Sequence, residues 1–378
     1  MVVSQTDPFD IFSLEARGNH ALYARMRRED PIHRALDPRT GAAVWFLTRY
    51  DDCVTFMKDK RFGKVPRSAA EPASAHAMQT AINRHMLNLD EPDHTRLKSL
   101  VHLVFTPGRV RDLRSRLQAI AEELLTTIDR EVAEGDEFDL AAHYGEVFPL
   151  LSIMEMLGLP AADYPEFRRW TKTVLLLSEE TSTETAILEL SHYLNQQIDA
   201  RRTHANAPDD LLTGLIFAEA AGDRLSREEL LSMVFLLFAA GYETVANFIN
   251  SSMLTLLNNL DQMRLLRDNL DDPVLVSSAV EELLRYNSPS YMTLPSWAFE
   301  DVVLGGKQIR CGDSVHAVLH AANRDPAVFD HPNVFAISRQ PNKHLAFSLG
   351  IHYCLGAPLA RLEGEIALTT LLRWLPDW

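Results

Sequence analysis

The sequence predicts a mainly α-helical protein with a small antiparallel β region. Apolar side chains recur at spacings of three and four over most of the 378 residues, which is typical of amphipathic helices. Segments with strand character are few and short. Strands and helices do not alternate along the chain, so a parallel sheet built from strand–helix–strand units is not expected.

Four helices have clear signals. Apolar residues line one face of the segment 113–125. The pattern S-R-E-E at residues 226–229 is a capping box and opens a long helix that reaches about residue 258. A third helix spans about 273–287, because a proline at 289 disfavours its continuation. The last helix begins after residue 354 and ends near residue 374.

Three short strand regions are expected. The segment AVWFLT at residues 43–48 follows the turn sequence DPRTG and indicates a hairpin. Residues 302–304 and 308–310 flank a Gly-Gly turn and indicate a second hairpin. Residues 315–319 form a third candidate strand.

Composition narrows the class of protein. The net charge of -15 argues against nucleic acid as a partner, because phosphate binding needs clustered Lys and Arg. Cys53, Cys311 and Cys354 are too few and too far apart for a disulfide framework or a zinc site, which fits a reducing cytoplasm.

The chain shows no sign of export or membrane insertion. Its first residues carry Asp7 and Asp10 and lack the cationic and apolar regions of a signal peptide. The most apolar stretch, 233–241, is far shorter than the ~20 residues of a membrane span. Residues 67–74 (RSAAEPAS) are interpreted as a loop within a single domain, 1–378. We therefore expect a soluble, cytoplasmic monomer.

One cysteine has unusual surroundings. Cys354 stands in FSLGIHYCLG, residues 347–356, with Gly350 and Gly356 on either side and His352 two residues earlier. Pro358 suits the first turn of the following helix, so Cys354 is expected near a helix N-terminus, where a thiolate is favoured.

The chemistry of this cysteine has several interpretations. A lone cysteine is most often a small buried apolar residue, and we interpret Cys53 and Cys311 in that way. A nucleophile at Cys354 would need an oriented base, and a zinc site would need three more ligands. A haem iron needs only one protein ligand, and a cysteinate can supply it.

A second unusual segment, AAGYET at residues 239–244, lies inside the long helix. Gly241 is a poor helix former, and Glu243 beside Thr244 is out of place in an apolar helix. The plain alternative is a packing glycine followed by a Glu-Thr pair that faces solvent.

The decapeptide 347–356, followed by Ala-Pro-Leu-Ala-Arg, resembles the haem-binding signature of the cytochrome P450 family, bacterial soluble type. Every fixed position of Phe-Gly-x-Gly-x-His-x-Cys-x-Gly matches except Ser348. The resemblance implies a triangular, helix-rich body and a haem b whose iron is bound by Cys354. It also implies that Phe347 packs beside the sulfur, that His352 contacts a propionate, and that Gly350 and Gly356 belong to the cofactor site.

The AAGYET segment is similar to the oxygen-activating segment of this family. The resemblance implies that Ala240 and Gly241 leave room for dioxygen and that Glu243 and Thr244 relay protons as catalytic residues. Val245 stands where relatives often have a second hydroxyl.

A third segment, LDEPDHTRLK at residues 89–98, resembles the family pattern Asp-x-Pro-x-His-x-x-x-Arg. It implies that His94 and Lys98 contact the haem propionates, with Lys98 in place of the usual arginine. Ser296 replaces another propionate-binding arginine, and Thr293 and Ser296 are expected to compensate in part through their hydroxyl groups.

The resemblance also assigns a structural network. Glu282 and Arg285 would form an ordinary surface pair by spacing alone, whereas the family pattern implies a buried trio completed by Arg339. The chain ends at residue 378, where relatives continue into a final strand pair, so that pair is expected to be missing.

The implied reaction is monooxygenation, meaning hydroxylation or epoxidation, of a lipophilic small molecule such as a polyketide, terpenoid, steroid or fatty acid. Apolar segments are expected to line its pocket: 62–87, 164–195, 235–239 and 291–294. Electrons are expected from a separate ferredoxin or flavodoxin. A basic cluster either docks this electron-donor protein or forms only a solvated helix face. It consists of Lys98, Arg109, Arg111, Arg114 and Arg116.

Three rival functions stay open at this point. The first is a peroxygenase driven by hydrogen peroxide, against which the Glu243–Thr244 pair counts. The second is a haem-based sensor or carrier without turnover, and the third is a helical scaffold in which Cys354 is inert.

Overall fold

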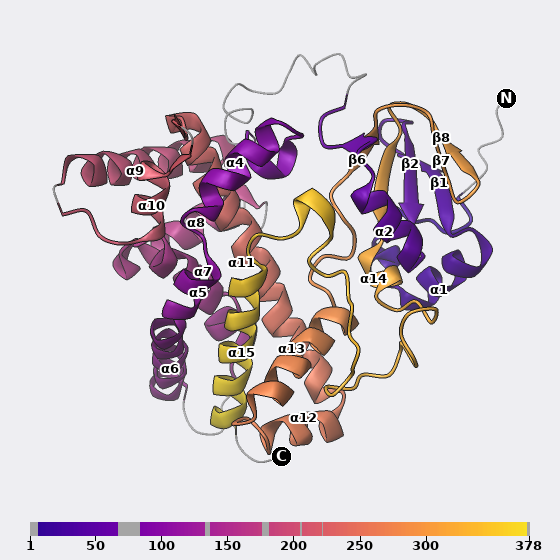
Figure 1. The fold of residues 1–378 in the computed structure, drawn as a ribbon. Coiled ribbons are helices and arrows are strands. Elements are labelled where there is room, and N and C mark those ends of the chain that lie inside the picture. The colour runs from indigo at the N-terminus through magenta and orange to yellow at the C-terminus, as the bar shows by residue number, and fades with distance from the viewer. Residues whose placement is uncertain are drawn as a thin grey trace. The chain divides into compact units, whose positions relative to one another are not determined.

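The computed structural model describes residues 7–66, 84–132, 137–175, 181–204, 206–220 and 222–375 (Figure 1). The chain falls into two compact units, each considered by itself below. Unit 1 comprises residues 1–72 and 255–355, and unit 2 comprises residues 73–254 and 356–378. The single domain expected from the sequence stays a prediction. The described residues are mainly helical with small sheets, as predicted.

Unit 1 contains a five-stranded sheet in the order β1-β2-β9-β6-β3. Its strands are β1 (Ile32–Leu36), β2 (Ala43–Leu47), β3 (Phe62–Gly63), β6 (Ser296–Ala298) and β9 (Ser314–Ala317). The predicted hairpin is confirmed, since β1 and β2 pair antiparallel. The second predicted hairpin forms a separate sheet of β7 (Val302–Leu304) and β8 (Lys307–Ile309). Strand β9 ends before residue 319, because the chain enters helix α14 (Leu319–Ala322).

One strand pair differs from the expected antiparallel arrangement. Strand β2 pairs with β9 in parallel, with Val44 opposite Ser314 and Leu47 opposite Ala317. The other pairs of this sheet are antiparallel. Because β2 and β9 lie far apart in sequence and share no turn, local patterns carry no information on their relative direction.

The sheet of unit 1 is covered on both faces. Trp45 and Leu47 of β2 share a core cluster with α2 (Tyr50–Lys58), whereas Val44 and Phe46 share another with α1 (His20–Glu29). This alternation follows from the two-residue period of a strand. The unit also contains α12 (Leu260–Arg267) and α13 (Pro273–Tyr286). Helix α13 matches the prediction, with Pro273 in its first turn and Asp272 as its cap.

The two cysteines predicted to be buried core residues, Cys53 and Cys311, differ in their exposure. Cys53 is fully buried in the cluster around α2, as expected. The same interpretation of Cys311 is wrong, because this residue is exposed in the turn after β8 and its thiol donates to the Phe299 carbonyl over 3.3 Å. Turn residues are seldom covered, and the sequence pattern around Cys311 did not distinguish a turn from a strand.

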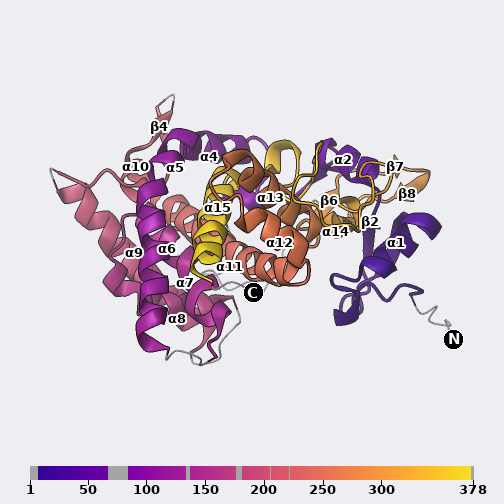
Figure 2. The ribbon, with the colours of Figure 1, turned by 90° about the horizontal axis from the view of Figure 1, so that it is seen from below.

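Unit 2 is built from helices. They are α4 (Asp93–His102), α5 (Pro107–Asp112), α6 (Arg114–Glu131), α7 (Val147–Met156), α8 (Tyr164–Val174), α9 (Thr183–Thr203), α10 (Leu211–Phe217), α11 (Arg227–Leu257) and α15 (Ala357–Trp374). Helices α6 and α15 lie side by side in both views (Figures 1 and 2). A short hairpin of β4 (Glu219–Ala220) and β5 (Asp223–Arg224) precedes α11.

The long helix α11 begins as its sequence predicts. The Ser226 hydroxyl accepts from the Glu229 backbone N–H over 3.2 Å, and the Glu229 carboxylate accepts from the Ser226 N–H over 2.9 Å. This reciprocal pair is the expected capping box. Among the helices in the described ranges, α11 alone is long and apolar enough to cross a membrane, but 56% of its apolar window is buried, as in a core helix. The predicted loop 67–74 lies outside the described residues.

Candidate functional site

The predicted cysteine lies on a tightly turned loop of unit 1. Residues 350–352 form one turn of 3₁₀ helix, and the Cys354 N–H donates to the Phe347 carbonyl over 3.0 Å. This bond closes a loop that contains Ser348 and Gly350, both with positive φ, of 59° and 74°. The backbone thus presents Cys354, which is half-buried, from a constrained position.

The two positive-φ residues require different explanations. Gly350 must be glycine, because a Cβ there would lie 2.4 Å from the Met57 carbonyl oxygen at the end of α2. Ser348 has no such freedom, and its left-handed backbone costs about 1 kcal/mol. Its hydroxyl contacts the Met57 sulfur at 3.2 Å. Sequence reasoning did not identify Met57, because nothing in α2 marks it as a neighbour of residues 348–350.

The residues that follow the cysteine begin helix α15. Gly356 is the N-cap residue of this helix, and Pro358 stands in its first turn, as predicted. Cys354 therefore lies two residues before the cap. Phe347 and His352, expected beside the sulfur and at a propionate, are both half-buried on the same loop of unit 1.

A buried charged network holds the segment that leads into this loop. Glu282 and Arg285 of α13 are fully buried, and Arg285 donates to both carboxylate oxygens over 2.7 and 2.8 Å. Arg339 donates to the same carboxylate over 3.1 Å. The predicted buried trio is confirmed, and the surface-pair alternative for Glu282 and Arg285 is rejected. The network fixes residue 339 fifteen residues before Cys354.

The hydroxyl residues expected to replace a propionate-binding arginine also lie in unit 1. Ser296 is buried on β6, opposite Val315 of β9. The Thr293 hydroxyl accepts from the Ala317 N–H over 3.1 Å, so its oxygen already has one structural partner. Their compensating role stays a prediction.

Unit 2 contributes the AAGYET segment of α11. The Thr244 hydroxyl donates to the Ala240 carbonyl one turn earlier over 2.6 Å. Ala240 and Glu243 are exposed on this helix and Thr244 is half-buried. Glu243 thus faces solvent, as in the plain alternative for this segment. An exposed Glu243 can exchange protons with water directly.

Gly241 has a packing reason of its own. A Cβ at this position would meet the Cδ1 atom of Ile153 in α7 at 2.8 Å, so glycine lets α7 approach α11. Gly241 is therefore a packing glycine, as in the plain alternative for this segment. Of the two residues expected to leave room for dioxygen, Ala240 is the one whose face of α11 is uncovered.

Helix α4 carries the two predicted propionate contacts. His94 is 3% exposed, and Lys98 is half-buried one turn later on the same helix. Burial, together with the positive charge of Lys98, lowers the pKa of His94, so its imidazole is neutral near pH 7. A neutral imidazole contacts a carboxylate as an N–H donor. Arg96 pairs with Glu229 and with Asp223, over 3.1 Å for the latter, and so fixes α4 to the start of α11.

Comparison with known proteins decides the family. The family model for cytochrome P450 matches residues 153–375. The polyketide biosynthesis cytochrome P450 PksS of Bacillus subtilis is 39% identical over 366 residues, which cover 94% of this chain and 88% of the relative. The cytochrome P450 monooxygenase PikC of Streptomyces venezuelae is 40% identical over 357 residues, 94% of this chain and 83% of that one.

The chain belongs to the cytochrome P450 family. Solved structures agree. The structure of PksS matches with a TM-score of 0.87 at 38% identity, covering 97% of this chain and 91% of that one. A myxobacterial cytochrome P450, CYP267B1 in complex with myristic acid, matches with a TM-score of 0.85 at 41% identity and the same coverage. The protein is therefore a cytochrome P450 monooxygenase, and the family implies a haem bound through a thiolate.

The residues of this cytochrome P450 fit such a group. Cys354 forms no disulfide within the described residues and lies on a loop whose turns are fixed by Gly350 and by the Cys354–Phe347 hydrogen bond. A cysteine thiolate is a haem-iron ligand, and a single one completes the protein's share of the coordination. His94 and Lys98 supply hydrogen-bond donors of the kind that carboxylate groups of the ring need.

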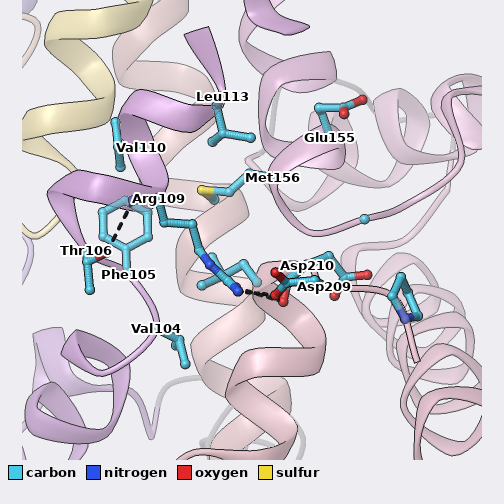
Figure 3. Close-up of a pocket in the computed structure, with 13 residues that line it drawn as sticks. Val104, Phe105, Thr106, Arg109, Val110, Leu113, Glu155, Met156, Asp209 and Asp210 are labelled. Carbon is cyan, nitrogen blue, oxygen red and sulfur yellow. Dashed lines mark hydrogen bonds and ion pairs between the residues drawn. The ribbon is translucent and has the colours of Figure 1, made fainter. Parts of the chain in front are cut away.

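A cavity in the described part of unit 2 lies elsewhere. It measures about 260 Å³ and shares no residue with the stretches expected to line the substrate pocket (Figure 3). Arg109 of α5 reaches toward Asp209 and Asp210, pairing with Asp209 and donating to the Asp210 carbonyl over 3.1 Å (Figure 3). The charge of Arg109 thus serves the fold of unit 2.

Other members of the predicted basic cluster are paired in the same way. Arg114 pairs with Glu365 of α15 at 2.6 Å, and Arg116 pairs with Glu155 of α7 at 3.1 Å. Arg111 is exposed and has no ion pair within the described part of the chain. The cluster is therefore less basic than its sequence indicates.

Proposed function

We propose that this cytochrome P450 hydroxylates or epoxidises a lipophilic small molecule at a haem b held by Cys354. The observation that carries the proposal is the loop of residues 347–354. It combines a cysteine that forms no disulfide within the described residues with turns at Ser348 and Gly350, and it matches the family signature at all fixed positions but one. When bound, the haem supplies reductive activation of dioxygen and insertion of one oxygen atom into the substrate.

Residues of the chain would bind the haem iron and the haem propionates. Cys354 would hold the haem iron through its thiolate, and Phe347 would pack beside that sulfur. His352, His94 and Lys98 would donate hydrogen bonds to the propionates. Gly356 and Ala240 leave room for the flat ring and the small gas, whereas Gly350 and Gly241 act through packing against Met57 and Ile153.

Proton delivery falls to α11. The Thr244 hydroxyl donates to the Ala240 carbonyl over 2.6 Å, and its oxygen can accept a hydrogen bond from water. It relays a proton when its O–H turns away from that carbonyl, releasing its own proton as it takes one from the water. The exposed carboxylate of Glu243 exchanges protons with bulk solvent one residue away. The pair therefore links solvent to the face of α11 at Ala240, which is a general-acid role. A peroxygenase would not need this pair.

The substrate class follows from apolar lining and from the relatives. Val174, Leu175, Phe235 and Ala239, from the stretches expected to line the pocket, are half-buried. Residues 67–83 and 176–180 of those stretches lie outside the described residues. One relative is named for polyketide biosynthesis, and one solved structure holds myristic acid. A polyketide or fatty-acid-like chain is the first substrate to test, by the high-spin spectral shift on binding, with terpenoids and steroids next.

Electrons come from a separate ferredoxin or flavodoxin, which we propose to dock near Lys98, Arg109, Arg111 and Arg114. Reversal of Arg109 or Arg114 would also break an internal ion pair, so Arg111→Glu is the sharper probe. It should slow the first reduction by the protein donor and leave reduction by dithionite unchanged. The matched control Arg34→Glu reverses an exposed arginine of unit 1 and should leave both rates unchanged. Equal rates for Arg111→Glu and the unaltered protein with the protein donor would reject this docking site.

We place the enzyme in the cytoplasm, because Cys53, Cys311 and Cys354 form no disulfide within the described residues, which suits a reducing compartment. Detection of the protein mainly in a membrane or periplasmic fraction would contradict this assignment.

The spectrum of the reduced carbon-monoxide complex tests the haem assignment. A strongly red-shifted Soret band is expected for the unaltered protein and for Cys311→Ala, which removes a thiol elsewhere in unit 1. Cys354→Ala should abolish it. Loss of the band in Cys311→Ala but not in Cys354→Ala would overturn the assignment, and a bound haem with no product under any electron donor would favour a sensor or carrier.

A further inference from the structure

Ser348 stands in a backbone conformation that its side chain disfavours. Its φ of 59° makes it one of three non-glycine residues with positive φ in the described ranges, the others being Asp10 and His331. Such a conformation persists only where the surroundings hold the residue in place, and it often marks a functional segment. Glycine would adopt this φ without cost, so the serine needs a compensating contact.

That contact is with Met57 at the end of α2. The Ser348 hydroxyl lies 3.2 Å from the Met57 sulfur, a soft acceptor, and the Ser348 N–H donates to the Leu345 carbonyl over 2.8 Å. Met57 itself packs against the buried core cluster around Phe56 and Leu345. The hydroxyl therefore joins a strained turn to a side chain that the core of unit 1 holds.

Met57 also restricts which residue can stand at position 350, two residues after Ser348. The Gly350 Cα approaches the Met57 carbonyl so closely that a Cβ would lie 2.4 Å from that oxygen. Between Phe347 and Cys354 the loop is closed by one backbone hydrogen bond of 3.0 Å. Residues 348–350 thus contact Met57 at both its side chain and its backbone carbonyl.

Helix α2 is a fixed support for this contact. At its start, the Tyr50 N–H donates to the Asp325 carboxylate over 2.9 Å, and the Tyr50 hydroxyl donates to the Lys343 carbonyl over 2.7 Å. Farther along the segment, the Leu345 N–H donates to the Asn323 side chain over 2.7 Å. The helix therefore contacts residues 343–350 at both of its ends.

We infer that Ser348 and Met57 are positioning residues that keep the Cys354 thiolate on the haem iron. Their hydroxyl–sulfur contact resists the movement of the 347–354 loop that would withdraw the sulfur and let it take up a proton. This inference rests on the proposed function, since it requires Cys354 to be the axial ligand. It assigns to Ser348, the one departure from the family signature, a role that glycine at this position cannot perform.

The test measures how fast the thiolate ligand is lost. The reduced carbon-monoxide complex is prepared from each variant, and the conversion of its red-shifted Soret band to the unshifted band is followed at one mild urea concentration. Ser348→Ala keeps the Cβ and the strain but removes the hydroxyl, and Met57→Leu keeps the volume but removes the sulfur. Each should convert about fivefold faster than the unaltered protein, as expected for loss of one hydrogen bond.

Further variants separate the contact from other effects. Because both single changes remove the same contact, the double variant should convert no faster than either single one. Ser348→Gly should also convert faster, although it relieves the backbone strain. The matched control Met263→Leu, at a buried methionine of α12 that belongs to neither α2 nor the loop, should stay within about twofold of the unaltered protein.

Specific results would overturn the inference. Conversion of Ser348→Ala and Met57→Leu at the rate of Met263→Leu would show that the contact does not hold the ligand. Effects that multiply in the double variant would show that the two residues act independently. Absence of the red-shifted band in the unaltered protein would refute the haem-thiolate assignment itself, whereas a normal band with unchanged conversion rates refutes only the role of Ser348 and Met57.

Discussion

Replacement of Glu363 by glutamine should remove a pH-dependent cost from the folded state. Glu363 of α15 is 2% exposed, and its Oε1 atom has no hydrogen-bond partner among the described residues. Burial raises the pKa of this carboxyl group to about 8, and a hydrogen bond with Ser152 of α7 offsets only part of that rise. The folded protein thus keeps a neutral carboxylic acid at neutral pH.

The sign and size of the effect follow from proton linkage. Below pH 4.5 both folded and unfolded states hold the proton, so the group contributes nothing. Between that pH and about 8 the unfolded chain loses its proton while the folded chain keeps it, so stability falls by about 1.4 kcal/mol per pH unit. Above pH 8 both states are ionised and the full cost, roughly 5 kcal/mol, persists.

The assay compares urea unfolding of the unaltered protein and Glu363→Gln at pH 6 and pH 9. The free energy of unfolding of Glu363→Gln should gain about 3 kcal/mol relative to the unaltered protein between these values, whatever the constant offset from the new amide. Glu365→Gln, two residues along α15 at a carboxylate that pairs with Arg114, is the matched control and should show no such gain. Parallel pH dependences for Glu363→Gln and the unaltered protein would refute the reasoning.

Three further changes test other parts of the structure. Gly350→Ala should lower the free energy of unfolding by about 2–4 kcal/mol and should lose most of the bound haem, because the new Cβ meets the Met57 carbonyl. Gly306→Ala, at a residue with a similar φ but open space around it, should lower the free energy of unfolding by only about 1 kcal/mol. Equal melting temperatures of the two variants would contradict this. Glu282→Gln should cost about 3–5 kcal/mol in urea unfolding, because it leaves the buried Arg285 and the partly buried Arg339 without their carboxylate, and a loss below about 1 kcal/mol would count against the network. Thr244→Ala should lower product formed per electron consumed about a hundredfold, while Thr244→Ser retains most of it; equal coupling in both would exclude the hydroxyl relay.

Local signals in the sequence were sufficient to predict where the helices around the site begin. The capping box at residues 226–229, Pro273 and Pro358 are each used as their positions predict, because caps and first-turn prolines act within one turn of helix. The motif around Cys354 likewise predicted its position just before α15.

Contacts between distant segments could not be predicted from local patterns. The parallel pairing of β2 with β9 leaves no mark in either strand. The approach of Met57 to Gly350 depends on how α2 packs, and the burial of Glu363 depends on α7. Arg109, which the sequence places in a basic surface cluster, pairs with Asp209 in the structure. Each of these is decided by tertiary packing, which single-residue properties do not encode.

The most direct test of the haem-thiolate assignment is the reduced carbon-monoxide spectrum of the purified protein beside Cys354→Ala. The unaltered protein should be pigmented, with a strongly red-shifted Soret band, and the variant should lack that band. A red-shifted band that survives Cys354→Ala, or its absence from the unaltered, haem-loaded protein, would contradict the assignment.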